Sequence, residues 1–293
     1  MSDPGGQPAA AGDPAGGRWW PAPAKLNLFL HINGRRPDGY HELQTVFQLL
    51  DWGDELDIQP TDGTDIVRTA GNESVPAEAD LVVRAARALQ QATGARAGAR
   101  IRLRKRIPMG GGLGGGSSDA ATVLRVLDQL WGTRIGVPAL AELGLGLGSD
   151  VPVFVHGSSA WAEGRGERLA PVELPESWFV VVHPGVSVGT AGIFQAPELT
   201  RNSPVLTIRA LSPALVRNDC EPVVRARHPE VAEALDWLGR HAPARLSGTG
   251  ACVFAAFARA AEAERVAARV PAPWRSYVAR GVQRSPLEAA LAP

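Results

Sequence analysis

The sequence has few lysines, few cysteines, few aromatic residues and no excess of charge of either sign. Its 30 basic residues balance 30 acidic ones, so a general attraction to nucleic acid or to an anionic membrane is excluded. No apolar stretch reaches the length of a membrane span, and the N-terminus lacks the basic flank and apolar core of a secretion signal. These absences predict a cytoplasmic protein that binds neither nucleic acid nor membrane.

The two cysteines, Cys220 and Cys252, have neither C-x-x-C nor metal-ligand spacing. They therefore indicate neither a disulfide framework nor a structural metal. Residues 1–17 are almost all Gly, Ala, Pro and Asp, a composition that predicts a disordered tail. At 293 residues, the chain is long enough for two domains with separate cores.

Glycine is concentrated in one segment, where it fills six of the seven positions from 110 to 116. A strand-like run over 101–107 precedes this segment, and a helical pattern over 120–131 follows it. Backbone without Cβ atoms can approach an anion closely, and the N–H groups at the start of a helix point toward it. The segment therefore predicts a phosphate-binding loop, with Ser117 or Ser118 as the N-cap of the helix.

Two familiar phosphate motifs fit this loop only in part. The glycines match G-x-G-x-x-G, but no apolar strand ending in an acidic residue follows about 20 positions later, as dinucleotide binding requires. Gly111 and Gly116 have the spacing of a P-loop, yet Ser117 stands where that motif requires lysine. The cation that neutralises the phosphates must come from another segment.

Only Lys25 and Lys105 are lysine among the 30 basic residues. In a chain so rich in arginine, a lysine indicates a place where a compact ammonium is needed, although chance retention is the competing interpretation. Lys105 directly precedes the glycine loop, and Lys25 lies in a strand-like alternation over 25–32. Asn27 shares a strand face with Lys25 at a distance of about 6.5 to 7 Å, so both could contact one ligand.

Asp150 is the candidate for a proton acceptor. Phosphoryl transfer requires a positioned nucleophile, cations against the developing charge and a partner for the acceptor proton. Asp150 lies in the turn Gly148-Ser-Asp-Val-Pro152, from which a carboxylate could project into a cleft. An aspartate that only stabilises the turn is equally compatible with this local sequence.

The remaining chain alternates between strand and helix patterns, which predicts an α+β fold. The predicted strands cover residues 25–32, 43–50, 153–155, 178–182, 251–257 and 276–282, and the predicted helices cover 80–91, 138–143, 230–240 and 260–268. Thr190 is placed to cap a short helical segment over 191–195.

Three motifs, at residues 23–28, 108–118 and 247–251, resemble in sequence and order those of the GHMP kinase superfamily. Further motifs at 36–41, 147–154, 183–187 and 218–221 resemble its branch that phosphorylates 4-diphosphocytidyl-2-C-methyl-D-erythritol in non-mevalonate isoprenoid biosynthesis. The resemblance extends from about residue 20 to the end, and several motifs in the right order are a specific signal.

The resemblance implies a two-domain GHMP kinase fold, with domains over 18–160 and 161–293 and the active site in the cleft between them. It implies transfer of the γ-phosphate of ATP to the 2-hydroxyl of this acceptor. The chemistry of that transfer implies Mg²⁺ bound to the nucleotide phosphates. Asp150 becomes the general base, and Lys25 the cation that orients it. The implied ATP site comprises Lys105, Pro108, Gly110, Gly111, Gly112, Leu113, Gly114, Gly115, Gly116, Ser117 and Ser118.

At the cytidine end, the resemblance implies that Tyr40 and Phe194 stack on the base and that His41 reads its polar edge. Base stacking is worth about 1 to 3 kcal/mol, although a phenylalanine is more often a core residue. Asn27 and Thr190 match further substrate positions.

Two aspartates, Asp119 and Asp80, stand where the resemblance shows asparagine in some relatives. Asp119 is expected to start the helix beneath the phosphates as its cap or, less favoured, as a Mg²⁺ ligand, and the resemblance suggests an adenine-side role for Asp80. The sequence names no metal-binding carboxylate.

Two other functions compete with this interpretation. One is another small-molecule GHMP kinase, acting on mevalonate, homoserine or a sugar, against which the pair Tyr40-His41 and Phe194 argue. The other is a non-catalytic nucleotide-binding regulator, which should lack the base or the cation, whereas this chain has both. The protein is expected to be a monomer or a weak homodimer.

Overall fold

The structure, a computed structural model, describes residues 17–207 and 216–292. The tail predicted to be disordered, residues 1–17, lies outside the described residues apart from Gly17. Within the described ranges, no helix combines the length and apolar character that a membrane crossing requires.

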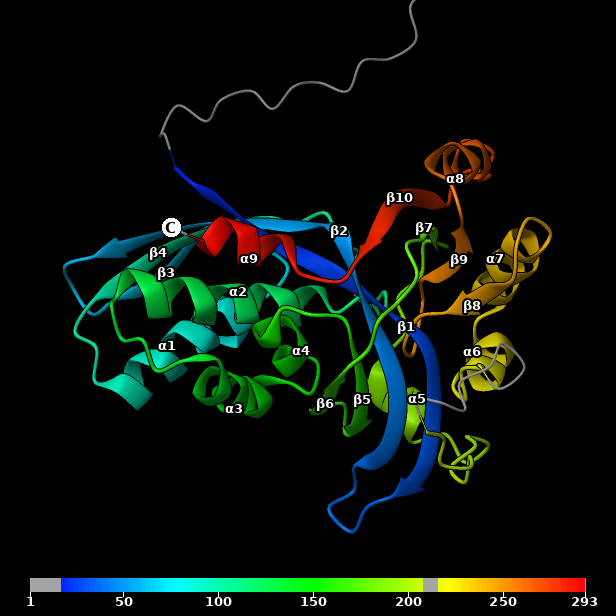
Figure 1. The fold of residues 1–293 in the computed structure, drawn as a ribbon, viewed down its shortest axis with the longest axis horizontal. Helices are drawn as coiled ribbons and strands as arrows, with labels where there is room; N and C mark the ends of the chain where they lie inside the picture. The colour runs from blue at the N-terminus through cyan, green and yellow to red at the C-terminus, as the bar shows by residue number, and fades with distance from the viewer. Residues whose placement is uncertain (1–16, 208–215, 293) are drawn as a thin grey trace, which may run out of the picture.

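Two long antiparallel strands form the centre of the fold (Figure 1). β1 (Trp19–Arg35) pairs along its length with residues 41–57 of β2 (His41–Thr61). The alternation over 25–32 predicts β1 correctly, and the structure extends the strand at both ends. Three further strands pair with β2: β4 (Gly98–Arg104), β5 (Ala160–Gly164) and β10 (Arg275–Val282).

Within the described residues the sheet has ten strands, and its main path runs in the order β3-β4-β2-β10-β7-β9-β8. The strands not yet given are β3 (Ile66–Ala70), β6 (Arg168–Pro171), β7 (Trp178–His183), β8 (Ala244–Leu246) and β9 (Val253–Phe257). β3 and β4 are parallel, and the other strand pairs are antiparallel. Because β10 pairs with both β2 and β7, it links the N-terminal strands to the C-terminal ones.

The helices form two groups, on the left and on the right of Figure 1. The first group, beside the N-terminal strands, consists of η1 (Ala77–Ala79), α1 (Leu81–Thr93), α2 (Gly115–Leu130), α3 (Val137–Leu147), α4 (Val151–His156) and α9 (Pro286–Leu291). The second group packs with the C-terminal strands and consists of α5 (Thr190–Phe194), α6 (Glu221–Arg227), α7 (Pro229–Gly239) and α8 (Ala260–Ala267). The predicted α+β class is confirmed.

Each group of helices covers its own apolar core, and a third cluster lies between the two cores. That third cluster contains Leu26 of β1, Phe254 of β9, and Ile107 and Leu113, which flank or belong to the glycine segment. Burial of such side chains stabilises a fold by about 1.5 to 3 kcal/mol each. The glycine segment is therefore packed against buried residues of both the N-terminal and the C-terminal strands.

Most predicted elements are confirmed, with small shifts at their ends. These are the helices over 80–91, 230–240 and 260–268 and the strands over 43–50, 178–182, 251–257 and 276–282. The domain boundary near residue 160 stays a prediction. Residues after this boundary also pack with the N-terminal strands, because β5 pairs with β2 and α9 packs on β1.

The strand predicted over 153–155 is wrong, because these residues belong to helix α4. Pro152 occupies the first turn, where its missing N–H is tolerated, and Gly157 ends the helix with φ +65°. A run of three apolar residues is too short for its period to distinguish a strand from a helix.

The helix predicted over 138–143 is too short, because α3 continues to Leu147. Gly144 is needed there for packing, since a Cβ on it would lie 2.6 Å from Cγ1 of Val151. Gly144 therefore allows α4 to pack closely, and neither this glycine nor Gly146 ends the helix.

Candidate active site

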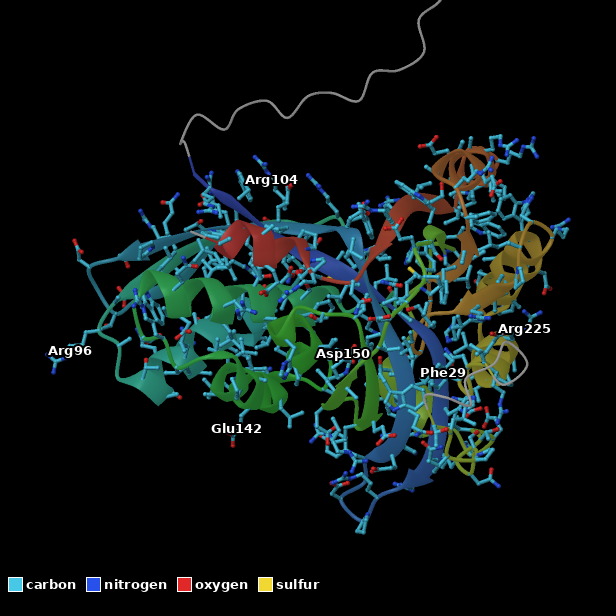
Figure 2. The ribbon with its side chains drawn as sticks, viewed as in Figure 1. Phe29, Arg96, Arg104, Glu142, Asp150 and Arg225 are labelled. Carbon is cyan, nitrogen blue, oxygen red and sulfur yellow. The ribbon has the colours of Figure 1, made fainter. Side chains whose placement is uncertain are left out.

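A cavity of about 850 Å³ lies between the two parts of the molecule and is lined by residues of both. Figure 2 labels Asp150 in the middle of the molecule, whereas Arg96, Glu142 and Arg225 lie at its outer edges. The structure brings to this cavity all the site residues predicted from the sequence except Ser118, which is fully buried. Those that line it are Lys25, Asn27, Tyr40, His41, Lys105, Pro108, Gly110, Gly111, Gly112, Leu113, Gly114, Gly115, Gly116, Ser117, Asp150, Thr190 and Phe194.

The glycine loop is held by a segment more than a hundred residues away, Ser247–Cys252. The Ser247 hydroxyl donates to the Gly112 carbonyl at 2.9 Å, and the N–H groups of Ala251 and Cys252 donate to the carbonyls of Gly110 and Gly111 at 2.9 and 3.1 Å. Gly112 has φ +72°, and a Cβ on it would lie 2.1 Å from the Ser247 carbonyl oxygen. Only glycine fits this contact, so the loop and the distant segment form one rigid wall.

Helix α2 begins earlier than the sequence predicts. Its N-cap is Gly114, with φ +74°, so the prediction of Ser117 or Ser118 as N-cap is wrong. The Ser118 N–H already donates to the Gly114 carbonyl inside the first turn. The first helical residues, Gly115 and Gly116, line the cavity, which places the free N–H groups of the helix where an anion could bind.

Lys25 and Asp150 form an ion pair at the cavity wall, with 3.1 Å between Nζ and Oδ2. The Lys25 ammonium also donates to Asn27 Oδ1 at 2.6 Å and to the Gly112 carbonyl at 3.1 Å. The Lys25 side chain is 4% exposed and the Asp150 side chain 32% exposed. The ammonium is thus fully satisfied and fixed, while the carboxylate remains accessible to a ligand.

The local fold explains the positions of these two side chains. The pairing of β1 with β2 shifts register before Lys25 and again after Asn27, and such irregularities re-aim side chains that a regular strand would place elsewhere. Asn27 is held in turn, because its Nδ2 donates to Thr45 Oγ1 at 3.0 Å. Asp150 directly precedes α4, in the predicted turn.

The prediction that Asp119 caps a helix is wrong, because Asp119 lies inside α2 and its side chain is buried. Its Oδ2 accepts from Lys105 Nζ at 2.6 Å, and Lys105 also donates to Asp54 Oδ2 at 2.5 Å. Asp119 Oδ1 is buried without a hydrogen-bond partner. Burial raises the pKa of Asp119 to about 7, against the opposing effect of the Lys105 ammonium.

Lys105 is therefore tied to two carboxylates at the base of the loop. Burial lowers its pKa, but Asp119 and Asp54 more than compensate, so its pKa is raised. Asp54 Oδ1 also accepts the N–H groups of Arg106 and Ile107, at 2.5 and 2.8 Å. Asp54 was missed at the sequence level, since an acid inside a strand carries no motif. It anchors the chain that leads into the glycine loop.

Tyr40 and His41 lie at the other end of the cavity. Tyr40 is 48% exposed, and the guanidinium carbon of Arg165 lies 3.6 Å from the centre of its ring. His41 stacks on Phe194, with 5.1 Å between ring centres and 29° between ring planes. The two aromatic faces expected around a base are therefore both present, but each has a protein partner on one side.

Arg201 fixes the state of His41. Its Nε donates to His41 Nε2 at 3.1 Å, so Nδ1 carries the proton of the neutral ring. Burial, together with the charges of Arg201 and Arg35, lowers the pKa of His41 and keeps the imidazole neutral at pH 7. Arg201 also donates to the carbonyls of Phe194, Ala196 and Leu199, so it holds α5 beside His41.

Thr190 does not cap α5, so that prediction is wrong. Gly189 is the N-cap, and Thr190 is the first helical residue. The Thr190 hydroxyl instead lies 3.0 Å from the Thr249 hydroxyl, which connects α5 to the segment that holds the glycine loop.

Asp80 is held by three structural partners. Asp80 caps α1 by accepting the Val82 N–H at 3.1 Å, pairs with Arg68, and accepts from Asn72 at 2.8 Å.

Cys220 and Cys252 are free and buried, and burial raises the pKa of Cys220 to about 12 and that of Cys252 further. Within the described ranges, no group of three or more His, Cys, Asp or Glu side chains could hold a metal ion.

Family models match both parts of the chain. Residues 80–158 match the model described as GHMP kinases N terminal domain, and residues 199–276 match GHMP kinases C terminal. The 4-diphosphocytidyl-2-C-methyl-D-erythritol kinase of Alkalilimnicola ehrlichii is 61% identical over 270 residues, which cover 92% of this chain and 93% of that protein. The chain belongs to the 4-diphosphocytidyl-2-C-methyl-D-erythritol kinase family. The enzyme of this name from Halorhodospira halophila is 56% identical, covering 93% of this chain and 96% of its own.

Solved structures agree with this family assignment. The crystal structure of a 4-(cytidine 5'-diphospho)-2C-methyl-D-erythritol kinase matches with a TM-score of 0.79 and 34% identity, over 90% of this chain and all of that one. A homoserine kinase from Cytophaga hutchinsonii matches with a TM-score of 0.67 but 18% identity, over 89% of this chain and 94% of that one. That second likeness shows only the fold. The two-domain GHMP kinase fold predicted from the sequence is confirmed.

Proposed function

We propose that the chain transfers the γ-phosphate of ATP to the 2-hydroxyl of 4-diphosphocytidyl-2-C-methyl-D-erythritol, in non-mevalonate isoprenoid precursor biosynthesis. The observation that carries the proposal is the Lys25–Asp150 pair, 3.1 Å apart in the wall of the cavity that the glycine loop also lines. A fixed cation and an accessible carboxylate beside a phosphate cradle are what transfer to an alcohol requires.

In this mechanism, the phosphates of ATP bind to the N–H groups of the glycine loop and of the first turn of α2. Asp150 accepts the proton of the acceptor hydroxyl, whose oxygen forms the new bond to the γ-phosphorus as the bond to the β-phosphate oxygen breaks. Lys25 orients Asp150 and stabilises charge that develops at the acceptor oxygen. The products are the 2-phosphate and ADP.

Mg²⁺ belongs to this proposal as a partner of the nucleotide. It binds nucleotide phosphates through one or two carboxylates at most and keeps several waters, so it needs no dedicated protein cage. Two oxygens near the base of the loop, Asp119 Oδ1 and Ser118 Oγ, are buried without a hydrogen-bond partner.

Cytosine would bind beside Tyr40 and the His41–Phe194 pair. Its O2 and N3 atoms are hydrogen-bond acceptors, and the Nδ1–H of a neutral His41 is a donor of the right kind. Asn27 and Thr190 line the same cavity. The cytoplasmic location and the monomeric or weakly dimeric state stay predictions.

The proposal is tested by ADP release from Mg-ATP with four acceptors: 4-diphosphocytidyl-methylerythritol, mevalonate, homoserine and galactose. Turnover with the cytidylyl acceptor alone, lost in Asp150→Ala, is the expected result. Turnover with one of the other three would identify a different GHMP kinase. Nucleotide binding without turnover on any acceptor would favour the regulator.

A further inference from the structure

Arg165 also lines the cavity, and its guanidinium has no role in the proposed mechanism or in the ATP-binding loop. The ammonium groups of Lys25 and Lys105 are each paired with carboxylates. Within residues 17–207 and 216–292, the Arg165 guanidinium has no carboxylate partner. Its Nε is buried without a hydrogen-bond partner, and its Nη2 has only a long contact, 3.4 Å, with Ser149 Oγ.

A half-buried cation without a counter-charge is unfavourable by itself, because burial removes part of its hydration. Arginine presents five N–H donors in a planar fork that matches the oxygens of a phosphate. Such a group facing a ligand cavity therefore indicates that an anionic part of the ligand completes it.

The position of Arg165 identifies which anion it faces. One contact of its side chain is with Ser149, the neighbour of Asp150 in the chain, and the other is with the Tyr40 ring, at 3.6 Å. The guanidinium therefore lies between Asp150, which marks the transfer end of the cavity, and Tyr40, which marks its base end. In the proposed acceptor, the diphosphate lies between the alcohol that is phosphorylated and the cytidine.

We infer that Arg165 binds the diphosphate of a cytidine-diphosphate-linked acceptor, with Tyr40 as the platform that fixes its guanidinium. This inference rests on the proposed function. One ring face of Tyr40 carries the guanidinium, and the tyrosine is exposed enough to offer the other face to the base. Arg165 is a binding residue that distinguishes a nucleoside diphosphate from a nucleoside.

The turn that carries Arg165 is itself well fixed. It joins β5 to β6, and its flanking glycines, Gly164 and Gly166, have φ +74° and +113°. The Arg165 N–H donates to Glu167 Oε2 at 2.6 Å, which closes the turn. A cation on a fixed turn loses little freedom when it binds an anion, so its contribution to affinity is large.

The test compares Arg165→Gln and Arg165→Lys with Arg168→Gln. Arg168 lies on the same hairpin but is exposed, pairs with Glu42 and does not line the cavity, so its substitution removes one charge nearby without touching the site. Binding of cytidine diphosphate and of cytidine is measured by calorimetry with Mg²⁺ and a non-hydrolysable ATP analogue at saturation. The analogue keeps the probes out of the ATP site.

Arg165→Gln should weaken cytidine diphosphate binding about 10- to 100-fold, as expected for loss of charge-assisted hydrogen bonds, and leave cytidine binding within about threefold. The acceptor KM should rise in parallel, while the KM for ATP stays unchanged. Arg165→Lys should retain part of the preference for the diphosphate, and Arg168→Gln all of it.

Two results would overturn the inference: an unchanged preference for the diphosphate in Arg165→Gln, or an equal loss for both probes, which would mean that Arg165 only supports Tyr40. Failure of the proposed function is a separate result, because it would appear as wild-type protein that does not phosphorylate the cytidylyl acceptor. If the wild type turns over and the variant keeps its preference, the proposed function stands and this inference fails.

Discussion

The two ends of the cavity are built differently. At the transfer end, the Lys25 side chain is 4% exposed and its ammonium contacts three oxygens, and the glycine loop is tied to Ser247–Cys252 through backbone contacts. At the base end, Tyr40 is 48% exposed and lies in the turn between β1 and β2, and His41 stacks on Phe194 of the five-residue helix α5. The rate of phosphate transfer depends on catalytic groups that are fixed before the substrate binds. The residues that recognise the base can instead become ordered when the substrate binds.

The ends also differ in how much of the chain they use. Lys25, Gly112, Asp150 and Ser247 come from four separate segments and meet within hydrogen-bond or ion-pair distance. A change at the transfer end should therefore remove activity outright. A change at the base end should weaken one substrate and leave the chemistry intact.

The largest effect is expected for Asp150→Asn. A proton acceptor contributes about 10²- to 10⁴-fold to a rate, so kcat should fall by about 10³-fold. The amide keeps the shape of the carboxylate, and Lys25 retains Asn27 and the Gly112 carbonyl, so binding of a non-hydrolysable ATP analogue should persist. Single-turnover kinetics and calorimetry measure the two quantities.

Glu142→Gln is the matched control, because Glu142 is an exposed acid on α3 at the edge of the molecule (Figure 2). It should retain wild-type kinetics. An Asp150→Asn protein within about tenfold of wild-type kcat would remove Asp150 as the base, given the contribution expected of one.

Gly112→Ala should damage the transfer end through its backbone. The residue has φ +72°, and the added Cβ would meet the Ser247 carbonyl oxygen at 2.1 Å. A left-handed conformation costs a residue with a Cβ about 1 to 2 kcal/mol, and the clash adds to it, so the loop must move. We expect loss of ATP affinity and a lower free energy of unfolding, measured by calorimetry and by urea titration.

Gly146→Ala supplies the comparison for that substitution. Gly146 lies in α3, with no atom within 4 Å of an added Cβ, and alanine favours helix by up to about 1 kcal/mol. This variant should be as stable as the wild type or more so. Equal ATP affinity in both variants would show that the close contact between the loop and Ser247 is not needed for nucleotide binding.

Tyr40→Ala should affect the base end alone. Loss of one stacked base contact, about 1 to 3 kcal/mol, corresponds to an increase of about 5- to 150-fold in the acceptor KM. The KM for ATP and kcat should change little, and Tyr40→Phe should retain most of the affinity. A fall in kcat with an unchanged acceptor KM would place Tyr40 at the transfer end instead.

The sequence predicts the transfer end better than the base end. The glycine loop, Lys25 and Asp150 lie in local patterns whose chemistry can be recognised from the residue types and their spacing, and the fold brings them together. Arg165 and Arg201 were missed, because an arginine in a chain rich in arginine carries no local signal. Their meaning comes from contacts with Tyr40 and His41, more than a hundred residues away.

Helix ends and short apolar runs were the other failures. Gly114 begins α2 because its positive φ allows the chain to turn directly into the helix, although serine is the commoner cap. The run over 153–155 is a helix because Pro152 and Gly157 set its ends, and the packing of α4 on α2 and α3 buries its apolar residues. The secondary structure of such segments is set by tertiary packing, which cannot be read from local propensity.

The effect expected for Asp119, beneath the loop, is on stability, and it appears as a dependence on pH. Burial raises the pKa of this carboxyl from an ordinary value near 3.8 to about 7. Between these two values the folded protein holds a proton that the unfolded chain has released, so this contribution to stability is present below pH 4 and is lost as the pH rises through 7.

Asp119→Asn removes this titration, because an amide carries no proton to lose. It also removes one partner of Lys105, a cost that stays constant between pH 5 and 8 because the pKa of Lys105 is raised and the lysine remains charged. The Tm of the variant relative to wild type should therefore rise from pH 5 to pH 7 and then level off toward pH 8, whatever its starting offset. Thermal unfolding at four pH values measures this change, with the exposed Asp62→Asn as control. Parallel Tm curves for Asp119→Asn and wild type would mean that Asp119 is ionised throughout, and that Lys105 compensates fully for its burial.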